Sequence, residues 1–261
     1  MLLCHVTPAV VLRTWPFGES DKIVSFLTET HGKLTGIAKG AKRSRKRFAN
    51  SLEPFSLVNL RFQDRAHSNL AFIVASDLAF GFKHLLTSLE KIVFASYLVE
   101  ITDGLIGERE ENRLVYRHLK DGLVHLEKQA MSLTFLTSFE LKLLRLAGYQ
   151  PLLDSCRRCG KERWHSCTMR WHFSPRDGGI LCDSCSRLRR EIFPLSAATL
   201  EFLTKLQEEE SMASFERSPP SVMLKELRSA VIRFIEFHME REIKSVAFLH
   251  QFSLGLVPSS K

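Results

Sequence analysis

The sequence predicts an α+β protein in which a small N-terminal β-barrel precedes an α-helical domain, with a cysteine-rich insert among the helices. Three observations predict this class. Short, partly alternating apolar segments fill the first 80 residues. Apolar residues recur at helical spacing from residue 85 onward. Four of the six cysteines form two Cys-x-x-Cys pairs. We therefore place one domain at 1–80 and a helical domain at 81–261, with the insert at 150–192.

The first domain is predicted to contain five strands. They cover residues 9–13, 23–28, 33–38, 55–63 and 70–75, with a break at 15–18 and turns at 30–32 and 64–69. Five short strands with a longer insertion after the third are typical of an OB-type barrel, although an SH3-like barrel fits the strand number almost as well. Glu19-Ser20-Asp21 is interpreted as a polar turn with capping oxygens, because acid–base catalysis needs carboxylates placed across a substrate.

Positive charge is unevenly distributed along the 261 residues. The formal net charge is +8, of which residues 1–80 carry +5 and residues 150–192 carry +4, while 81–149 is neutral and the remainder is −1. Concentrated positive charge on a globular chain with a sequence pI near 9.3 favours a polyanionic partner, most often nucleic acid.

The insertion after the third strand, Lys39 to Phe48, is basic at six of its ten positions and has no acidic residue. At the rim of an OB face these side chains would neutralise phosphates, although a solvated loop without a task is the alternative. Aromatic residues beside it, Trp15, Phe17 and Phe48, are candidates for stacking on bases. The predicted DNA-binding residues are Lys39, Lys42, Arg43, Arg45, Lys46 and Arg47, with Arg61 and Arg65 as outliers.

The two cysteine pairs predict a metal site formed by Cys156, Cys159, Cys182 and Cys185. Two such turns facing each other form a tetrahedral thiolate cage suited to Zn²⁺, and a closed cage makes the metal structural, one per chain. A predicted hairpin, residues 168–173 returning at 180–181, brings the pairs together, and Gly160 is expected at positive φ. A redox dithiol is the alternative chemistry, and His165, Cys167 or His172 is an alternative ligand.

Helices are predicted at about residues 85–100, 110–127, 132–146, 196–207 and 221–241. Thr87 or Ser88 is expected to cap the first, and Gly148 to close the third. Residues 206–220 are expected to form a loop, and the chain past residue 257 to fray.

Enzymatic motifs are absent from the sequence. There is no phosphate-binding Gly-x-x-x-x-Gly-Lys loop, no Gly-x-Ser-x-Gly elbow and no His-Glu-x-x-His, so we expect a protein that is not an enzyme. The N-terminus lacks the features of a signal peptide, and no apolar run reaches the roughly 18 residues of a membrane span. The expected location is therefore the cytoplasm, with no membrane partner.

Several ordered motifs resemble the bacterial RecO recombination-mediator family. In the first domain these are Gly18-Glu19-Ser20-Asp21, Gly32-Lys33, Lys39-Gly40-Ala41 and Leu52-Glu53-Pro54-Phe55. Farther on they are residues 146–151 leading into the first cysteine pair, and Phe173-Ser174-Pro175 with Gly178-Gly179 before the second. The resemblance spans the chain to about residue 190.

The resemblance implies an N-terminal OB domain, a helical domain and a zinc-binding insert. It also implies a function: RecO proteins bind single- and double-stranded DNA, anneal complementary strands, act with RecR, and help RecA displace single-strand-binding protein during repair. It thereby implies a nucleoid-associated, cytoplasmic protein. Because some members of that family lack the cysteines, the resemblance favours a zinc ion that supports the fold.

A second hypothesis is a protein-interaction adaptor. Its basic surface would bind acidic protein segments such as the C-terminal tail of single-strand-binding protein, in a groove between helices of residues 85–147 edged by Arg113, Arg117 or Lys120. A third, a nucleic-acid-modifying enzyme that grips its substrate with the insert, has no cofactor loop or nucleophile in its favour.

Overall fold

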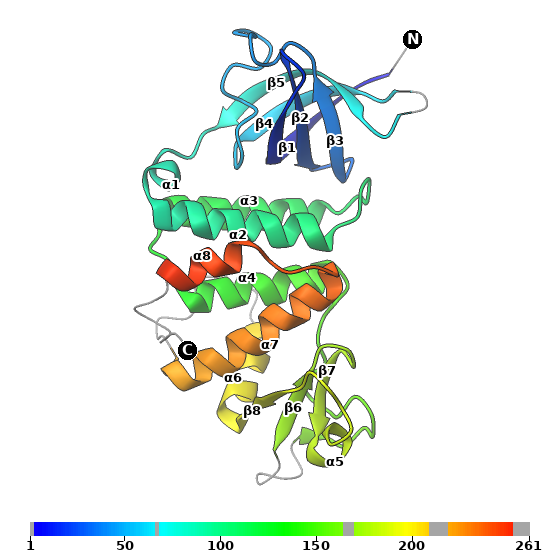
Figure 1. The fold of residues 1–261 in the computed structure, drawn as a ribbon, viewed down its shortest axis with the longest axis vertical. Coiled ribbons are helices and arrows are strands. Elements are labelled where there is room, and N and C mark those ends of the chain that lie inside the picture. The colour runs from blue at the N-terminus through cyan, green and yellow to red at the C-terminus, as the bar shows by residue number, and fades with distance from the viewer. Residues whose placement is uncertain (1–2, 66–67, 164–169, 209–218, 253–261) are drawn as a thin grey trace. The chain divides into compact units, whose positions relative to one another are not determined.

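The computed structural model describes residues 3–65, 68–163, 170–208 and 219–252, with the side chains of 250–252 excepted. The chain folds into two compact units, 1–129 and 130–261, which we describe separately. The first contains the barrel and three helices, and the second contains the remaining helices and a small sheet (Figure 1). The domain boundaries expected from the sequence, at residues 80 and 81, stay a prediction.

The barrel of the first unit is closed by five strands, β1 (Cys4–Phe17), β2 (Asp21–Thr28), β3 (Lys33–Ala38), β4 (Leu57–Gln63) and β5 (Ala71–Phe80). Their order is β1-β2-β3-β5-β4, with β4 returning to β1 and with β3 and β5 parallel. The fold class expected from the sequence, an N-terminal five-stranded barrel followed by helices, is confirmed.

The strand break expected at residues 15–18 is wrong, because β1 continues to Phe17. Beyond Val10, β1 pairs only with β2, so that Pro16 lies opposite Lys22 in an edge segment. Proline is tolerated at an edge because its missing N–H removes no bond from a second neighbour. The long β1–β2 hairpin that results extends the barrel beside the basic insertion.

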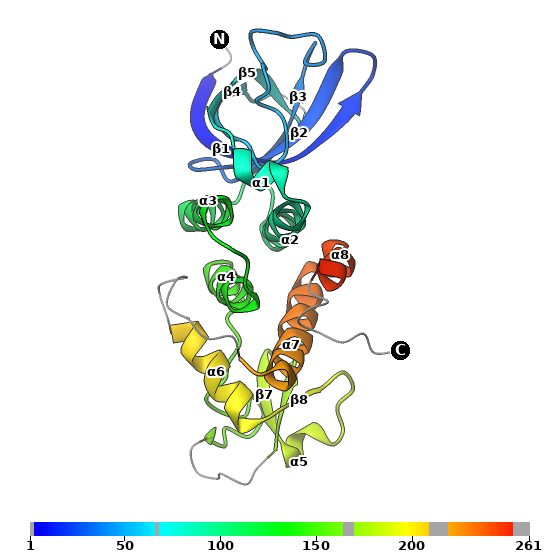
Figure 2. The same ribbon diagram turned by 90° about the vertical axis from the view of Figure 1, so that its left-hand side faces the viewer.

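Three helices complete the first unit: α1 (Lys83–Thr87), α2 (Leu89–Leu105) and α3 (Arg113–Lys128). Ser88 caps α2 by accepting a hydrogen bond from the Lys91 N–H, as the sequence predicts, and Asn112 caps α3 in the same way. Figure 2 shows α2 and α3 nearly end-on, side by side next to the barrel. Asp103 of α2 forms ion pairs with Arg13 of β1 at 3.0 Å and with Lys33 of β3 at 3.3 Å. These ion pairs join α2 to the barrel.

The second unit packs α4 (Leu133–Leu146), α6 (Ala197–Glu208) and α7 (Ser221–Met239) against one another, and α8 (Ser245–Phe252) follows. Gly148, at φ +83°, follows Ala147, the C-cap residue of α4, and closes this helix as expected. Glu140 of α4 is fully buried and accepts hydrogen bonds at 2.6 Å from the Arg228 guanidinium of α7. Removing one member of such a pair costs about 3–5 kcal/mol, because the other charge is left buried.

The insert belongs to the second unit and is built on the predicted hairpin, β6 (Trp171–Ser174) and β7 (Gly179–Cys182). A short helix, α5 (Asp183–Ser186), follows β7, and β8 (Phe193–Leu195) adds a third strand beside β6. Phe173 of β6 packs edge-to-face on Phe234 of α7, with ring centroids 5.3 Å apart. This contact attaches the insert to the helices. The sequence patterns predict neither β8 nor α8.

Candidate nucleic-acid interface and metal centre

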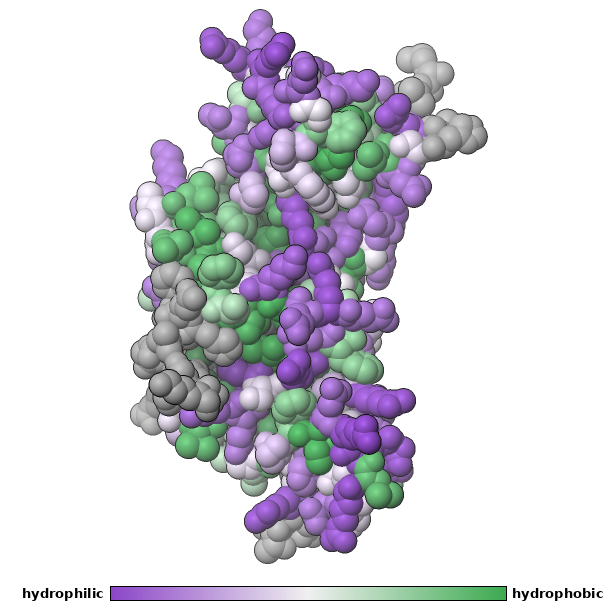
Figure 3. Space-filling model, in the orientation of Figure 1, coloured by the Kyte–Doolittle hydropathy of each residue, from purple (hydrophilic) through white to green (hydrophobic). Residues whose placement is uncertain are grey.

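The basic insertion forms the connection between β3 and β4. Its six cationic side chains, Lys39, Lys42, Arg43, Arg45, Lys46 and Arg47, are all exposed. Within the described residues, none of the six has a carboxylate oxygen within the 4.0 Å of an ion pair. Hydrophilic side chains project from the barrel at the end where this connection lies (Figure 3). The connection therefore presents uncompensated positive charge to solvent.

The start of this connection is anchored by Asp21, the first residue of β2. Its carboxylate accepts the N–H of Gly40 at 2.8 Å and the hydroxyl of Ser20 at 3.0 Å. The Gly40 N–H is the main cause that lowers the pKa of Asp21; burial opposes the shift, and Ser20 and the nearby Lys39 and Lys42 add to it. Gly40 itself sits at φ +68°, which a residue with a Cβ adopts only with strain. The polar turn predicted from the sequence thus fixes where the basic connection leaves the barrel.

Lys42 joins the basic connection to the tip of the β1–β2 hairpin. Its backbone N–H donates to the Ser20 carbonyl at 2.9 Å, and its ammonium donates to the Gly18 carbonyl at 2.7 Å. Trp15 and Phe17, near the end of β1, are 43% and 50% exposed. Two exposed aromatic rings and the cationic connection therefore belong to the same end of the barrel. We call these eight residues the basic–aromatic surface: Trp15, Phe17, Lys39, Lys42, Arg43, Arg45, Lys46 and Arg47.

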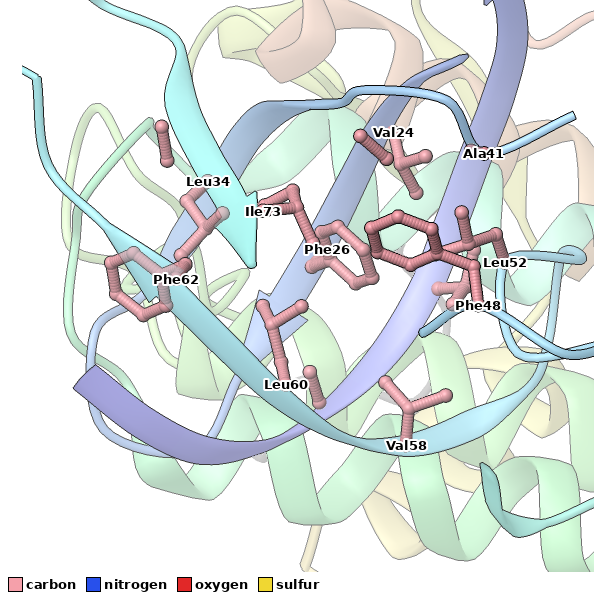
Figure 4. Packing of buried hydrophobic residues seen from close by; sticks show 14 residues of the cluster. Val24, Phe26, Leu34, Ala41, Phe48, Leu52, Val58, Leu60, Phe62 and Ile73 are labelled. Atoms are coloured by element: carbon pink, nitrogen blue, oxygen red, sulfur yellow. The ribbon is translucent and has the colours of Figure 1, made fainter. Parts of the chain in front are cut away.

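The expectation that Phe48 stacks on bases is wrong, because its ring is only 4% exposed and belongs to the barrel core. Figure 4 shows the ring directed into the barrel toward Phe26, near Leu52. The Arg47 guanidinium lies 5.0 Å from the centroid of this ring and donates to the Lys39 carbonyl at 2.9 Å. The Arg47 carbonyl in turn accepts the Ser76 N–H of β5 at 2.9 Å. Phe48 thus anchors the far end of the basic connection.

The two outlying cations predicted to contact DNA lie elsewhere on the barrel. Arg61 of β4 is exposed but pairs with Asp77 of β5 at 3.4 Å. Arg65 is exposed in the connection that follows β4. The structure does not join either residue to the basic–aromatic surface by a described contact, and the DNA-binding role of all eight predicted cations stays a prediction.

The four predicted metal ligands are brought together in the insert. The Sγ atoms of Cys156, Cys159, Cys182 and Cys185 all lie within 4.8 Å of one another, and those of Cys159 and Cys182 are 3.7 Å apart. Tetrahedral zinc–thiolate bonds of about 2.3 Å require sulfur separations of about 3.8 Å. The donor set and its spacing therefore fit one tetrahedral metal ion. Gly160, at φ +69° as predicted, turns the chain after the first pair.

Backbone N–H groups stabilise negative charge on the first thiolate. Burial raises the pKa of Cys156, but the N–H groups of Cys182, Cys159 and Arg158 outweigh it and lower the pKa to about 6. Burial raises the pKa of Cys182, and the neighbouring thiol groups, Cys182 first, raise that of Cys185 to about 12. A cation bound at this cluster would stabilise all four thiolates.

His172, one of the three alternative ligands, is not part of this cluster. Trp171, not His172, lies opposite Cys182 in the β6–β7 ladder, so His172 faces the other side of the sheet. His165 and Cys167 lie outside the described residues. Among described residues, the metal-ligand group contains only the two Cys-x-x-Cys pairs.

Two of the three basic residues assigned to a peptide groove, Arg113 and Arg117, already have a partner within the first unit. Arg113 donates to the Glu29 carboxylate at 2.8 Å, and Arg117 lies 3.8 Å from the same oxygen. Lys120 is half-buried. One carboxylate therefore offsets part of the charge that the adaptor hypothesis needs.

Comparison with known proteins identifies the family. The model for the N-terminal region of recombination protein O matches residues 1–82, and the model for its C-terminal region matches residues 86–247. The chain belongs to the RecO family. Proteins named DNA repair protein RecO are similar over nearly their whole length. The Anaeromyxobacter dehalogenans (strain 2CP-C) protein is 33% identical over 242 residues, 93% of this chain and 94% of that protein.

Two further RecO relatives show the same extent of similarity. The Syntrophus aciditrophicus protein is 32% identical over 255 residues, 97% of this chain and 98% of its own length. The Myxococcus xanthus protein is 34% identical over 247 residues, which are 94% of this chain and 97% of that protein.

Among the described residues, no helix has both the length and the apolar character that crossing a membrane requires.

Proposed function

We propose that this protein is a DNA-binding recombination mediator that acts in DNA repair. It binds single- and double-stranded DNA through the basic–aromatic surface and anneals complementary strands. With RecR it helps to load RecA onto DNA covered by single-strand-binding protein, whose C-terminal tail it contacts, in the cytoplasm at the nucleoid. Family membership and the names of the relatives support the repair role. The observation that carries the DNA-binding proposal is the set of six exposed cations without a described carboxylate partner.

The surface supports this function through electrostatics and stacking. DNA phosphates pair with the six cationic side chains that have no described carboxylate partner. This pairing releases the counterions that were bound to the DNA. Trp15 and Phe17 supply apolar rings on which bases stack without regard to sequence. Neutralising the phosphates of two strands lowers their repulsion and raises the local concentration of complements. Annealing by this route needs no covalent step, so we propose that the protein is not an enzyme.

We propose that the four cysteines hold one Zn²⁺ with a structural role. Cys156, Cys159, Cys182 and Cys185 would occupy all four tetrahedral positions, and a closed site leaves none for water or substrate. A metal ion held by these four residues would join the loop after residue 156 to the start of α5. Elemental analysis of the purified protein should find one zinc per chain, and a different metal in that stoichiometry would contradict the assignment.

The decisive experiment removes charge from the basic connection. We expect Arg43→Gln, Arg45→Gln and Lys46→Gln together to leave the fold intact, because all three side chains are exposed and make no described hydrogen bond within the protein. Each lost phosphate contact lowers the slope of log affinity against log salt by about 0.7 for single strands, so the triple variant should bind about 130-fold more weakly at 0.1 M salt. Fluorescence anisotropy with a labelled single strand over a salt series measures both quantities.

The matched control removes the same charge elsewhere. Lys83, Lys128 and Lys225 are exposed lysines outside the barrel. Their combined change to Gln should leave the salt slope near that of the unmodified protein. Equal losses in the two triple variants would show that net charge, and not this surface, determines binding.

A further inference from the structure

Arginines from separate segments of the insert converge on Asp177. Its Oδ1 accepts from Arg189 at 2.9 Å and from Arg158 at 3.3 Å, and its backbone carbonyl accepts from the Arg157 Nε at 3.0 Å. Its other carboxylate oxygen accepts the Ser174 hydroxyl at 2.7 Å. Asp177 therefore holds the arginines in place, but a single carboxylate offsets only one of the positive charges gathered around it.

The same region carries more cationic side chains than carboxylates. Arg187 lies 3.6 Å from Asp183 with its side chain 76% exposed, and the exposed Arg176 and Arg190 have no carboxylate within 4.0 Å among the residues described. We call the six the arginine cluster: Arg157, Arg158, Arg176, Arg187, Arg189 and Arg190. Hydrophilic side chains cover the visible face around α5 (Figure 3). Like charges held this close are stabilised by a polyanion.

An exposed apolar side chain lies between two of these arginines in the sequence. Leu188 is 97% exposed, and it lies in the turn between Arg187 and Arg189. The turn is fixed on both sides, since the Arg189 N–H donates to the Ser186 carbonyl at 2.9 Å and Cys185 belongs to the thiolate cluster. A leucine flanked by guanidinium groups matches a nucleic-acid strand, which offers phosphates on one side and apolar base faces on the other.

We propose that the arginine cluster with Leu188 is a second nucleic-acid contact of this chain, distinct from the basic–aromatic surface of the barrel. The inference rests on the proposed DNA-binding function and extends it: one chain holds nucleic acid at two places, each in its own unit. Arg187 and Arg190 contact phosphates, and Leu188 contacts base or sugar. Two contacts on one chain give an annealing protein a grip on each of two strands.

The test uses a short oligonucleotide of about 8 nucleotides, which matches the roughly 4–16 nucleotides that one compact binding site covers. At low salt, the unmodified full-length protein should bind two such strands per chain. Arg187→Gln with Arg190→Gln should weaken binding at the second site about 25-fold at 0.1 M salt. Each of the two lost phosphate contacts lowers the slope of log affinity against log salt by about 0.7. Leu188→Ala should weaken that site without changing its salt slope, because an apolar contact releases no counterions.

The control variant is Lys205→Gln with Lys225→Gln, which removes the same charge from α6 and α7 of the same unit and should leave both sites unchanged. Zinc content and circular dichroism establish that each variant is folded. One strand bound per chain by the unmodified protein, or two sites of unchanged affinity in the Arg187 and Arg190 variant, would overturn the inference.

The barrel triple variant separates the two proposals. If it loses one site and keeps the other, both stand, whereas unchanged binding at both sites sinks the barrel assignment alone. Preferential binding of an acidic peptide, instead of the oligonucleotide, at the arginine cluster would show that this surface recognises protein.

Discussion

Phe48→Ala tests whether the basic connection is held by the barrel core. The sequence offers Phe48 as an exposed ring for stacking, whereas the structure buries it beside Phe26. The two roles predict opposite results. A stacking residue changes DNA affinity and leaves stability alone, while a core residue destabilises the barrel when it is truncated. The substitution therefore distinguishes a base contact from a structural anchor.

The expected magnitude follows from the burial of the ring. A phenylalanine that is 4% exposed removes about 150–200 Å² from water, which at about 25 cal/mol per Å² is worth about 4 kcal/mol. Measured Phe→Ala changes in cores, about 3–5 kcal/mol, agree with this value. Since about 1.4 kcal/mol corresponds to a factor of ten, amides that exchange by opening of the whole barrel should exchange about 10³-fold faster.

Hydrogen exchange followed by mass spectrometry is the suitable assay, because peptides from β1 to β5 report on the barrel alone. Phe48→Leu is the matched control and should restore most of the protection, since it returns apolar volume to the same site. Phe17→Ala is the converse control, because that ring is 50% exposed and its loss should weaken single-strand binding without faster exchange. Unchanged exchange in Phe48→Ala would refute the structural role derived for this residue.

The remaining predictions concern the second unit. Gly179→Ala should lower the thermal midpoint of the second unit and weaken metal retention, because an added Cβ would lie 2.2 Å from the Leu152 carbonyl oxygen. Gly160→Ala is the control, since an added Cβ there would have no atom within 4 Å. Its effect should be smaller in the same calorimetric and metal assays. His238 is stacked on Tyr149, and its buried Nε2 has no hydrogen-bond partner among the described residues. Burial lowers the pKa of His238 below the ordinary 6.5. Its contribution to stability is thus present above pH 6.5 and is lost as the pH falls through the lowered pKa. His238→Phe should therefore flatten the loss of stability below about pH 6.5 in urea unfolding.

The features that can be predicted from the sequence are those that depend on neighbouring residues along the chain. The barrel strands alternate, the cysteine pairs recur at a fixed spacing, and Ser88 and Gly148 stand at helix ends, so each signal lies within a few residues of the feature it predicts. All four clustered cysteines are predictable for this reason. Their thiol groups meet because the hairpin between them is also a local signal.

The features that cannot be predicted depend on contacts between distant residues. Phe48 follows a basic run, and the sequence alone suggests that it shares the solvent exposure of that run, but the chain turns inward at this point and the ring enters the core. Asp177 gives no signal in the sequence beyond a turn, because its role depends on arginines 12 to 20 residues away. The full length of β1 is not predictable because the tolerance for Pro16 depends on where β4 ends.

The hydrogen bonds of the basic connection limit what it can recognise. The Gly40 N–H is used by Asp21, the Arg43 N–H by the Gly40 carbonyl, and the Lys42 N–H by the Ser20 carbonyl. Backbone donors at these positions are therefore occupied within the protein, so in the proposed DNA complex the contacts would come from the cationic side chains. Cations on long side chains contact phosphates without reading bases, and stacking on Trp15 or Phe17 accepts any base. The proposed function, at any site where DNA is damaged, requires this combination of salt-sensitive affinity and indifference to sequence.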